Sequence, residues 1–334
     1  MERCIQLAKI GRSKASPNPS VGCVIVYNNQ IIGEGFTSPF GGSHAEVNAI
    51  LSVKDTALLS EAILYVTLEP CCHHGKTPPC TDLIIESQIK KVVVGCLDPN
   101  PKVSGKGIER LKNAGIEVLS GMLEKQCKEV HKEFLTFHTK NRPYILLKWA
   151  ESSDGLIAPF QKNELRPFWI SNKYSQQLSH KLRADYQAIL VGANTVRADQ
   201  PQLTTRLWFG NNPKRFVISQ KGNDSLLCTF EEKSLVQLIG PDIIDFSKNV
   251  AQQLCDYFHG QNINSLIVEG GSQTINSFIE ENLWDEVMIF KSDQLLKNGI
   301  KSPKISTIAS SKTVIINDTL EHYHNQLLET TSID

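Results

Sequence analysis

The hydrophobic positions in the first 140 residues follow two alternating patterns. Apolar runs of strand length cover residues 21–27, 31–36, 62–68, 91–95 and 116–119. Segments with the three-to-four-residue spacing of amphipathic helices cover residues 2–11, 44–51, 81–87, 105–115 and 124–139. Asn28-Asn29 between the first two runs predicts a β-hairpin, and Gly11 is the predicted end of the first helix. Helices that alternate with buried strands predict an α/β sandwich with its ligand site at the strand ends.

The alternation restarts after Asn141-Arg142-Pro143, which indicates a domain boundary. Strands are predicted at residues 144–149, 188–191 and 266–268. One helix is predicted to end near Arg183, and another to begin near Gln273. We therefore predict two α/β domains, residues 1–142 and 143–334.

The composition is that of a globular protein with two cores. The chain has 334 residues, 40% hydrophobic and 21% charged, which gives no reason to expect extended disorder. The formal net charge is zero, which argues against a nucleic-acid substrate. Nine cysteines, several of them in apolar runs, indicate reduced thiols and metal ligands rather than disulfides. Since no apolar stretch has the length of a membrane span or a signal peptide, we expect a cytoplasmic protein without membrane or nucleic-acid partners.

The stretch of residues 44–80 combines His44 and Glu46 with three thiols. His44-Ala45-Glu46 opens it, and Pro70-Cys71 and Cys80 follow. A zinc ion bound by one imidazole and two thiolates keeps a fourth position for water, which then ionises near neutral pH. A carboxylate that is not a ligand can carry the proton, and Glu46 is placed for this role. We predict His44, Cys71 and Cys80 as zinc ligands and Glu46 as the catalytic proton carrier.

The match to the nucleobase-deaminase pattern, H-x-E followed by P-C-x-x-C, is partial. Eight residues separate Cys71 from Cys80 instead of two, and Cys72 is too close to Cys71 for both to bind one ion comfortably. Taken singly, a lone cysteine is usually a small buried hydrophobe. A structural zinc module is an alternative, and it would need a fourth protein ligand such as Cys72 or His73.

A second candidate site follows the strand at residues 266–268. It runs into Glu269-Gly270-Gly271 and then a helix, where small residues admit close backbone approach and free N–H groups can bind a phosphate. Alone this signal is weak, because such a turn is more often only a tight connection.

Several motifs together resemble the bifunctional riboflavin-biosynthesis deaminase-reductases. The deaminase-like motifs are Asn18-Pro19-Ser20-Val21-Gly22, His44-Ala45-Glu46-Val47, Thr67-Leu68-Glu69-Pro70-Cys71, His73-His74-Gly75-Lys76-Thr77-Pro78-Pro79-Cys80 and Asp98-Pro99-Asn100-Pro101. The reductase-like motifs are Ser153-Asp154-Gly155, Trp169-Ile170-Ser171, the stretch from Thr195 to Arg206, and Val268-Glu269-Gly270-Gly271. The segment inserted before Cys80 distinguishes the chain from cytidine and tRNA-adenosine deaminases. A deaminase of that kind, joined to an unrelated C-terminal domain, is the second alternative.

The resemblance implies a cytidine-deaminase-like α/β/α sandwich followed by a dihydrofolate-reductase-like α/β domain. It implies Zn²⁺ and NADPH as cofactors and a small phosphoribosylaminopyrimidine as substrate, deaminated first and then reduced at the ribose; a homo-oligomer is expected. The implied NADPH contacts are Ala150, Trp169, Ser171, Thr195, Asp199, Gly271, Ser272 and Ser277. The implied substrate contacts are Asn18, His73, Lys76, Arg183, Leu203, Arg206 and Glu269, although a surface arginine paired with a glutamate is a competing interpretation of Arg183.

The chain departs from the family pattern at two places in its second half. Pro167 stands where the family usually has a serine, and Glu151-Ser152-Ser153 replaces Ala-Ser-Leu before Asp154-Gly155. These departures predict a reductase that is altered in rate or substrate affinity.

Overall fold

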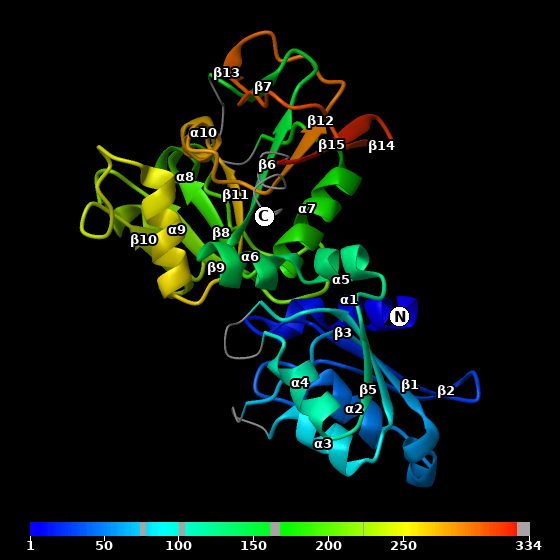
Figure 1. Ribbon diagram of the computed structural model, residues 1–334. Coiled ribbons are helices and arrows are strands. Elements are labelled where there is room, and N and C mark those ends of the chain that lie inside the picture. Colours follow the sequence, from blue (N-terminus) through cyan, green and yellow to red (C-terminus); the bar gives the residue numbers. More distant parts are fainter. Residues whose placement is uncertain (74–77, 100–103, 161–167, 223, 326–334) are drawn as a thin grey trace. The chain divides into compact units, whose positions relative to one another are not determined.

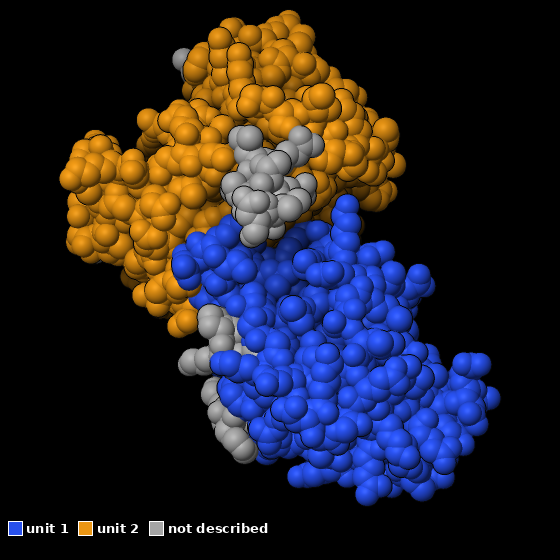
Figure 2. All heavy atoms as spheres, viewed as in Figure 1, with its two compact units in different colours: residues 1–141 blue, residues 142–334 orange. Residues whose placement is uncertain are grey.

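The computed structural model describes residues 1–73, 78–99, 104–160, 168–222 and 224–325. The chain divides into two compact units, Met1–Asn141 and Arg142–Asp334, which are coloured separately in Figure 2. Each unit has its own main sheet and its own hydrophobic core. No helix among the described residues is long and apolar enough to cross a membrane.

Unit 1 is an α/β/α sandwich (Figure 1). Its strands are β1 Gly22–Tyr27, β2 Gln30–Phe36, β3 Ile63–Leu68, β4 Lys91–Cys96 and β5 Glu117–Ser120. Its helices are α1 Glu2–Ala15, α2 Ala45–Leu51, α3 Cys80–Glu86, α4 Lys106–Asn113, α5 Glu124–Val130 and α6 Lys132–Lys140, with a 3₁₀ turn η1 at Thr56–Glu61. The sheet order is β2-β1-β3-β4-β5, antiparallel where β1 meets β2 and β3, and parallel from β3 to β5. Helices α1 and α5 pack on one face, and α2, α3 and α4 lie on the other.

Most elements of unit 1 lie where the sequence predicts them, and the hairpin prediction is confirmed. Asn28 and Asn29 connect β1 to β2 with φ angles of 47° and 60°, a left-handed conformation that asparagine tolerates in tight turns.

Two helix predictions in unit 1 are wrong. Helix α1 continues past Gly11 to Ala15, and a Cβ at Gly11 would lie 2.5 Å from Ser20 Oγ, so this glycine permits close packing instead of ending the helix. The predicted long helix at residues 124–139 is two helices, α5 and α6. They meet at His131, a buried residue with φ −102° and ψ 11° whose Nε2 lies 3.0 Å from Thr67 Oγ1.

Unit 2 is built around an eight-stranded sheet of order β10-β9-β8-β11-β6-β12-β15-β14. Its strands are β6 Tyr144–Glu151, β7 Leu156–Pro159, β8 Ala188–Gly192, β9 Lys214–Ile218, β10 Val236–Ile239, β11 Ser265–Gly270, β12 Glu286–Lys291, β13 Gly299–Lys301, β14 Ser311–Ile315 and β15 Asp318–His324. Its helices are α7 Lys173–Asp185, α8 Ala193–Asp199, α9 Val250–Gly260 and α10 Ser272–Glu280, with 3₁₀ turns η2 Asp224–Thr229 and η3 Lys233–Leu235. Strands β7 and β13 pair separately.

Six neighbouring strands of unit 2 are parallel, from β10 to β12, and β15 and β14 add an antiparallel edge. Side chains of α9 and α10 pack in the core on one face, and those of α7 and α8 in the core on the other. Because β8 and β11 are parallel neighbours, their carboxyl ends lie together, and each leads directly into a helix. This is the position at which α/β sheets form ligand sites.

Candidate functional site

Three predicted metal ligands of unit 1 come together in the structure. His44 is the N-cap of α2, Cys71 follows β3, and Cys80 is the first residue of α3. His44 Nδ1 lies 3.5 Å from Cys71 Sγ and 3.3 Å from Cys80 Sγ, and the three ligand atoms all lie within 4.8 Å of one another. With Zn–N near 2.0 Å and Zn–S near 2.3 Å, a tetrahedral ion separates nitrogen from sulfur by about 3.5 Å. The three donors therefore fit a zinc ion.

The electrostatics of the Cys71 thiol favour metal binding, whereas the hydrogen bond with Cys71, and secondly burial, raises the pKa of the Cys80 thiol. Hydrogen bonding with Cys80, and secondly with His44, lowers the pKa of the Cys71 thiol to about 4 against the opposing effect of burial. The backbone N–H of Cys80 also donates to Cys71 Sγ over 3.3 Å. A thiolate is the form of cysteine that binds metal, so Cys71 is prepared as a ligand at neutral pH.

Glu46 lies in the first turn of α2, beside the ligands but outside their cluster. Its side chain is buried, with the residue 4% exposed. Burial, and secondly the negative charge of Cys71, raises the pKa of Glu46 to about 7. A carboxyl group that titrates near neutral pH can both accept and donate a proton, as general acid–base catalysis requires.

Glu69 is a buried residue of this region to which the sequence analysis gave no role. Its carboxylate accepts hydrogen bonds from the backbone N–H groups of Asp98, Gly105, Gly107 and Ile108 at 2.9–3.3 Å. It thus fixes the start of α4 next to the segment that carries Cys71. The sequence feature that could have indicated Glu69 is a carboxylate directly after an apolar strand.

The structure describes two of the three predicted substrate contacts of unit 1, Asn18 and His73. Asn18 lies in the turn after α1, where its backbone N–H donates to Ala15 O over 3.0 Å. His73 is exposed. Lys76 lies outside the described residues, so its role stays a prediction.

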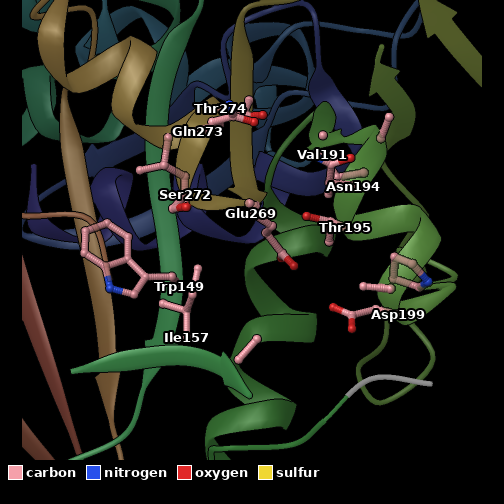
Figure 3. Close-up of a pocket in the computed structure, with 18 of the residues that line it drawn as sticks. Trp149, Ile157, Val191, Asn194, Thr195, Asp199, Glu269, Ser272, Gln273 and Thr274 are labelled. Atoms are coloured by element: carbon pink, nitrogen blue, oxygen red, sulfur yellow. The ribbon is translucent and has the colours of Figure 1, made fainter. Parts of the chain in front are cut away.

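Unit 2 contains a cavity of about 870 Å³ at the carboxyl ends of β8 and β11. All of the residues predicted for this domain line it: Ala150, Trp169, Ser171, Arg183, Thr195, Asp199, Leu203, Arg206, Glu269, Gly271, Ser272 and Ser277. Figure 3 shows Glu269 on β11 and Thr195 and Asp199 on α8 directed toward its centre, with Ser272, Gln273 and Thr274 at the start of α10. The cavity thus joins segments more than 100 residues apart in the sequence.

The start of α10 is an uncapped helix N-terminus that opens into this cavity. Gly271 is its N-cap and offers no side-chain hydrogen bond to the first N–H groups. A Cβ at Gly271 would lie 3.2 Å from Thr195 Oγ1, and one at Gly192 would lie 2.8 Å from Thr274 Oγ1. Glycine is thus needed where the two strand–helix turns approach each other. Free N–H groups at such a helix start bind phosphate, which fits a dinucleotide cofactor.

Three charged side chains form a network in the floor of the cavity. Arg183 binds Glu269 with two hydrogen bonds, Nε to Oε1 at 3.0 Å and Nη2 to Oε2 at 2.7 Å. Lys148 Nζ lies 4.0 Å from Glu269 Oε2. Burial alone would raise the pKa of Glu269, but Arg183 and Lys148 outweigh it and lower the pKa to about 2. Burial lowers the pKa of Lys148, and Glu269 opposes that effect.

This network changes the interpretation of Arg183 and adds Lys148 to the residues of the site. Arg183 pairs with a glutamate, as the competing interpretation has it, but it is buried instead of lying at the surface, and it also lines the cavity. Lys148 was not predicted as a site residue. The sequence feature that could have indicated Lys148 is a single cation in the apolar run Tyr144 to Trp149. A lysine buried in a strand requires a partner or a function.

Arg206 and Leu203 lie on the loop after α8. Arg206 makes a 3.3 Å hydrogen bond from Nη1 to Thr204 Oγ1 and no salt bridge with another described residue. Burial, and secondly the charge of Arg183, lowers its pKa, although the residue is exposed. Leu203 is buried with a φ of 57°, a conformation that is strained for leucine. A cation without a carboxylate partner suits an anionic ligand group.

One of the two departures from the family pattern lies among the residues that the structure describes. Glu151, Ser152 and Ser153 are not among the cavity-lining residues; Glu151 accepts a hydrogen bond from Trp149 Nε1 at 3.0 Å, and Ser152 Oγ donates to Asp154 at 2.6 Å. Pro167 lies outside the described residues.

Two family models match the chain. Residues 1–96 match the cytidine and deoxycytidylate deaminase zinc-binding region, and residues 143–296 match the RibD C-terminal domain. The first match contains all three predicted zinc ligands, and the second contains the cavity residues named above.

Characterised relatives and solved structures are similar over nearly the full length. The riboflavin biosynthesis protein RibD of Aquifex aeolicus is 38% identical over 321 residues, which covers 90% of this chain and 88% of the relative. That of Bacillus amyloliquefaciens is 36% identical, covering 91% and 86%. The crystal structure of a diaminohydroxyphosphoribosylaminopyrimidine deaminase/5-amino-6-(5-phosphoribosylamino)uracil reductase from Thermotoga maritima is 38% identical with a TM-score of 0.86, covering 97% of each chain. Acinetobacter baumannii RibD, form 2, is 31% identical with a TM-score of 0.82, covering 96% of each.

Proposed function

Because this chain belongs to the RibD family of riboflavin-biosynthesis enzymes, we propose that its two units catalyse consecutive steps, deamination at the His44–Cys71–Cys80 cluster and reduction at the cavity of unit 2. The chain is a bifunctional deaminase and reductase, with zinc and NADPH as cofactors. Membership thus establishes the reaction classes, and the geometry supports the assignment of residues to them.

The proposed substrate is 2,5-diamino-6-(5-phosphoribosylamino)pyrimidin-4(3H)-one. Water replaces the 2-amino group, giving 5-amino-6-(5-phosphoribosylamino)uracil and ammonia. The second step adds a hydride from NADPH to C1′ of the ring-opened ribosylimine and a proton to its nitrogen, and gives the ribitylamino product and NADP⁺. The activity named for the similar Thermotoga maritima protein supports this choice.

For the first step, the proposed roles follow from the positions of four side chains. His44, Cys71 and Cys80 would hold the zinc ion, which when bound acts as a Lewis acid and lowers the pKa of a coordinated water. Glu46 accepts one proton from the water and delivers it to the ring nitrogen, and it then carries the second proton, from the newly formed hydroxyl group, to the departing amine. Its raised pKa of about 7 supports reversible proton transfer at neutral pH.

For the second step, unit 2 binds and orients two ligands in one cavity. The N–H groups at the start of α10 would hold a phosphate of NADPH, which supplies the hydride. Arg206 would bind the sugar phosphate, and the Lys148–Glu269–Arg183 network would orient the ribose. Holding the two reactants at contact distance is itself a large part of catalysis in such a reaction.

The observation that carries the proposal is the three-ligand cluster beside a buried, non-ligating glutamate. We would incubate the purified full-length protein with the diaminopyrimidine ribosyl phosphate, with and without NADPH, and identify the products by mass. We expect the deaminated compound alone without NADPH and the ribitylamino compound with it. An unchanged substrate in both reactions would reject the proposal.

Substitution Cys80→Ser is expected to abolish deamination and leave reduction intact. A serine hydroxyl does not replace a thiolate as a zinc ligand, so zinc affinity at this cluster should fall steeply. Ammonia release measures the first activity, and oxidation of NADPH with the deaminated intermediate measures the second in the same preparation. Loss of both activities together would mean that the units do not act through separate sites.

Substitution Arg206→Ala is expected to raise the KM of the reductase for its phosphorylated substrate. Charge-assisted hydrogen bonds contribute about 1.5–3 kcal/mol, so the rise should be roughly 10- to 100-fold with a smaller effect on kcat. Arg197→Ala is a matched control on the same cavity wall, because Arg197 already bonds to Asn194 Oδ1 at 2.7 Å. Equal KM values for Arg206→Ala and the parent enzyme would show that Arg206 does not bind the substrate phosphate.

The cellular setting and assembly stay predictions. All nine cysteines are free, which supports the proposal that the enzyme works in the reducing cytoplasm. A homo-oligomer is also proposed, and sedimentation of the purified chain measures it.

A further inference from the structure

A second group of metal-binding side chains lies in unit 2, on a part of the sheet that does not line the cavity. It consists of Glu286 on β12 and His322 and His324 on β15. The two strands are antiparallel, with Glu286 opposite His324 and Met288 opposite His322. Residues two apart on a strand share a face, so all three side chains project from the same face of the sheet.

The possible ligand atoms of this cluster lie close to one another. His322 Nε2 lies 3.5 Å from Glu286 Oε2, and His324 Nδ1 lies 3.7 Å from Glu286 Oε1. The two imidazole rings have centroids 4.4 Å apart, and one ligand atom from each residue lies within 4.8 Å of the others. These separations are close to the edge lengths of a coordination polyhedron around an ion with bonds of about 2.0–2.2 Å.

Direct hydrogen bonding does not account for the arrangement. His322 Nε2 is shielded from solvent and has no hydrogen-bond partner among the described residues, and it faces a carboxylate on a residue that is 1% exposed. Such an orphaned nitrogen is costly unless something binds it. Two imidazoles and one carboxylate at these separations can share one metal ion.

The surroundings of Glu286 resemble the support that metal-bound carboxylates receive. The phenol of Tyr144 on β6 hydrogen-bonds the Glu286 side chain. A phenol O–H donates to a carboxylate oxygen, so Tyr144 is the donor. Partners of this kind orient a ligating carboxylate and are a regular part of metal sites.

We propose that Glu286, His322 and His324 form a binding site for a divalent transition-metal ion of the zinc class, separate from the His44–Cys71–Cys80 cluster. Two imidazoles and one carboxylate favour zinc, cobalt or nickel over calcium or magnesium, which prefer all-oxygen ligands. Three protein ligands leave a fourth position for water. The ion would tie β15 to β12 and so fasten an antiparallel edge of the sheet.

Zinc binding to full-length protein tests this site once the first cluster is disabled. In a Cys71→Ser/Cys80→Ser background, titration with Zn²⁺ should show one ion per chain. Adding His322→Gln/His324→Gln should remove that ion, whereas adding His259→Gln, on α9, should not. Reductase activity and the circular dichroism spectrum report that each variant is folded.

Cobalt gives an independent, spectroscopic test of the proposed site. Co²⁺ bound to the Cys71→Ser/Cys80→Ser protein should give visible d–d bands of a nitrogen–oxygen site, and Glu286→Gln should weaken its binding at least tenfold. The proposal is overturned if this background binds no zinc and gives no cobalt bands. It is equally overturned if the ion remains bound when both histidines are replaced.

Discussion

Substitution Glu46→Gln is expected to lower the kcat of deamination by about 10²–10⁴-fold while zinc stays bound. Glutamine has nearly the same shape but cannot accept a proton, so the metal ligands are unaffected and the proton transfer is lost. Glu46 is buried beside the ligands, and its carboxyl has a pKa near 7 in this environment. Ammonia release measures the rate, and metal analysis measures the zinc content of the same sample.

A matched control for Glu46 is Glu61→Gln, an exposed carboxylate at the end of η1 in the same unit. It should deaminate at the parent rate. Should Glu46→Gln release ammonia as fast as this control, another group must carry the proton. If instead zinc is lost from Glu46→Gln, the residue supports the metal and its catalytic role is unproven.

Substitution Glu269→Gln is expected to lower kcat/KM of the reductase by about 10²–10³-fold, because truncating one partner of a buried charge pair costs roughly 2–5 kcal/mol. Glu269 holds Arg183 through two hydrogen bonds and lies 4.0 Å from Lys148. Without this negative charge, both cations face each other in the cavity floor. Oxidation of NADPH with the deaminated intermediate measures the effect.

The pH profile of Glu269→Gln provides a second and specific reading. Glu269 raises the pKa of Lys148 against the effect of burial, so its removal lowers that pKa further. If reduction needs the Lys148 ammonium, activity is present below this pKa and is lost as pH rises through it. The alkaline loss of activity should therefore move to lower pH in the variant. Glu280→Gln, exposed on α10, is the control, and a parent-like rate and profile in Glu269→Gln would contradict the assigned network.

The sequence predicts those elements well that depend only on residues close together in the chain. Asn28-Asn29 between two apolar runs needs only neighbouring residues to form a turn, and the hairpin is present. The mixed α/β class of both halves is likewise confirmed by the two sheets and by the family matches. His44, Cys71 and Cys80 converge because each lies at the start of a helix or the end of a strand, where the fold places ligands.

Features that depend on distant contacts could not be predicted. Gly11 looks like a helix end but is required by the approach of Ser20, and His131 interrupts a helical pattern because its ring packs against Thr67. Lys148 becomes a site residue only because β6 lies next to β11, which carries Glu269. A single lysine in an apolar run gives no indication of its partner, which is 121 residues away in the sequence.

A crystal structure of the zinc-loaded, full-length protein would show the ligands of the ion at the first cluster. We expect an ion bonded to His44 Nδ1, Cys71 Sγ and Cys80 Sγ, with a water as the fourth ligand within hydrogen-bonding distance of the Glu46 carboxylate. A fourth protein ligand such as Cys72 or His73 in place of that water would mean a structural zinc site, and the deaminase assignment of these residues would then be wrong.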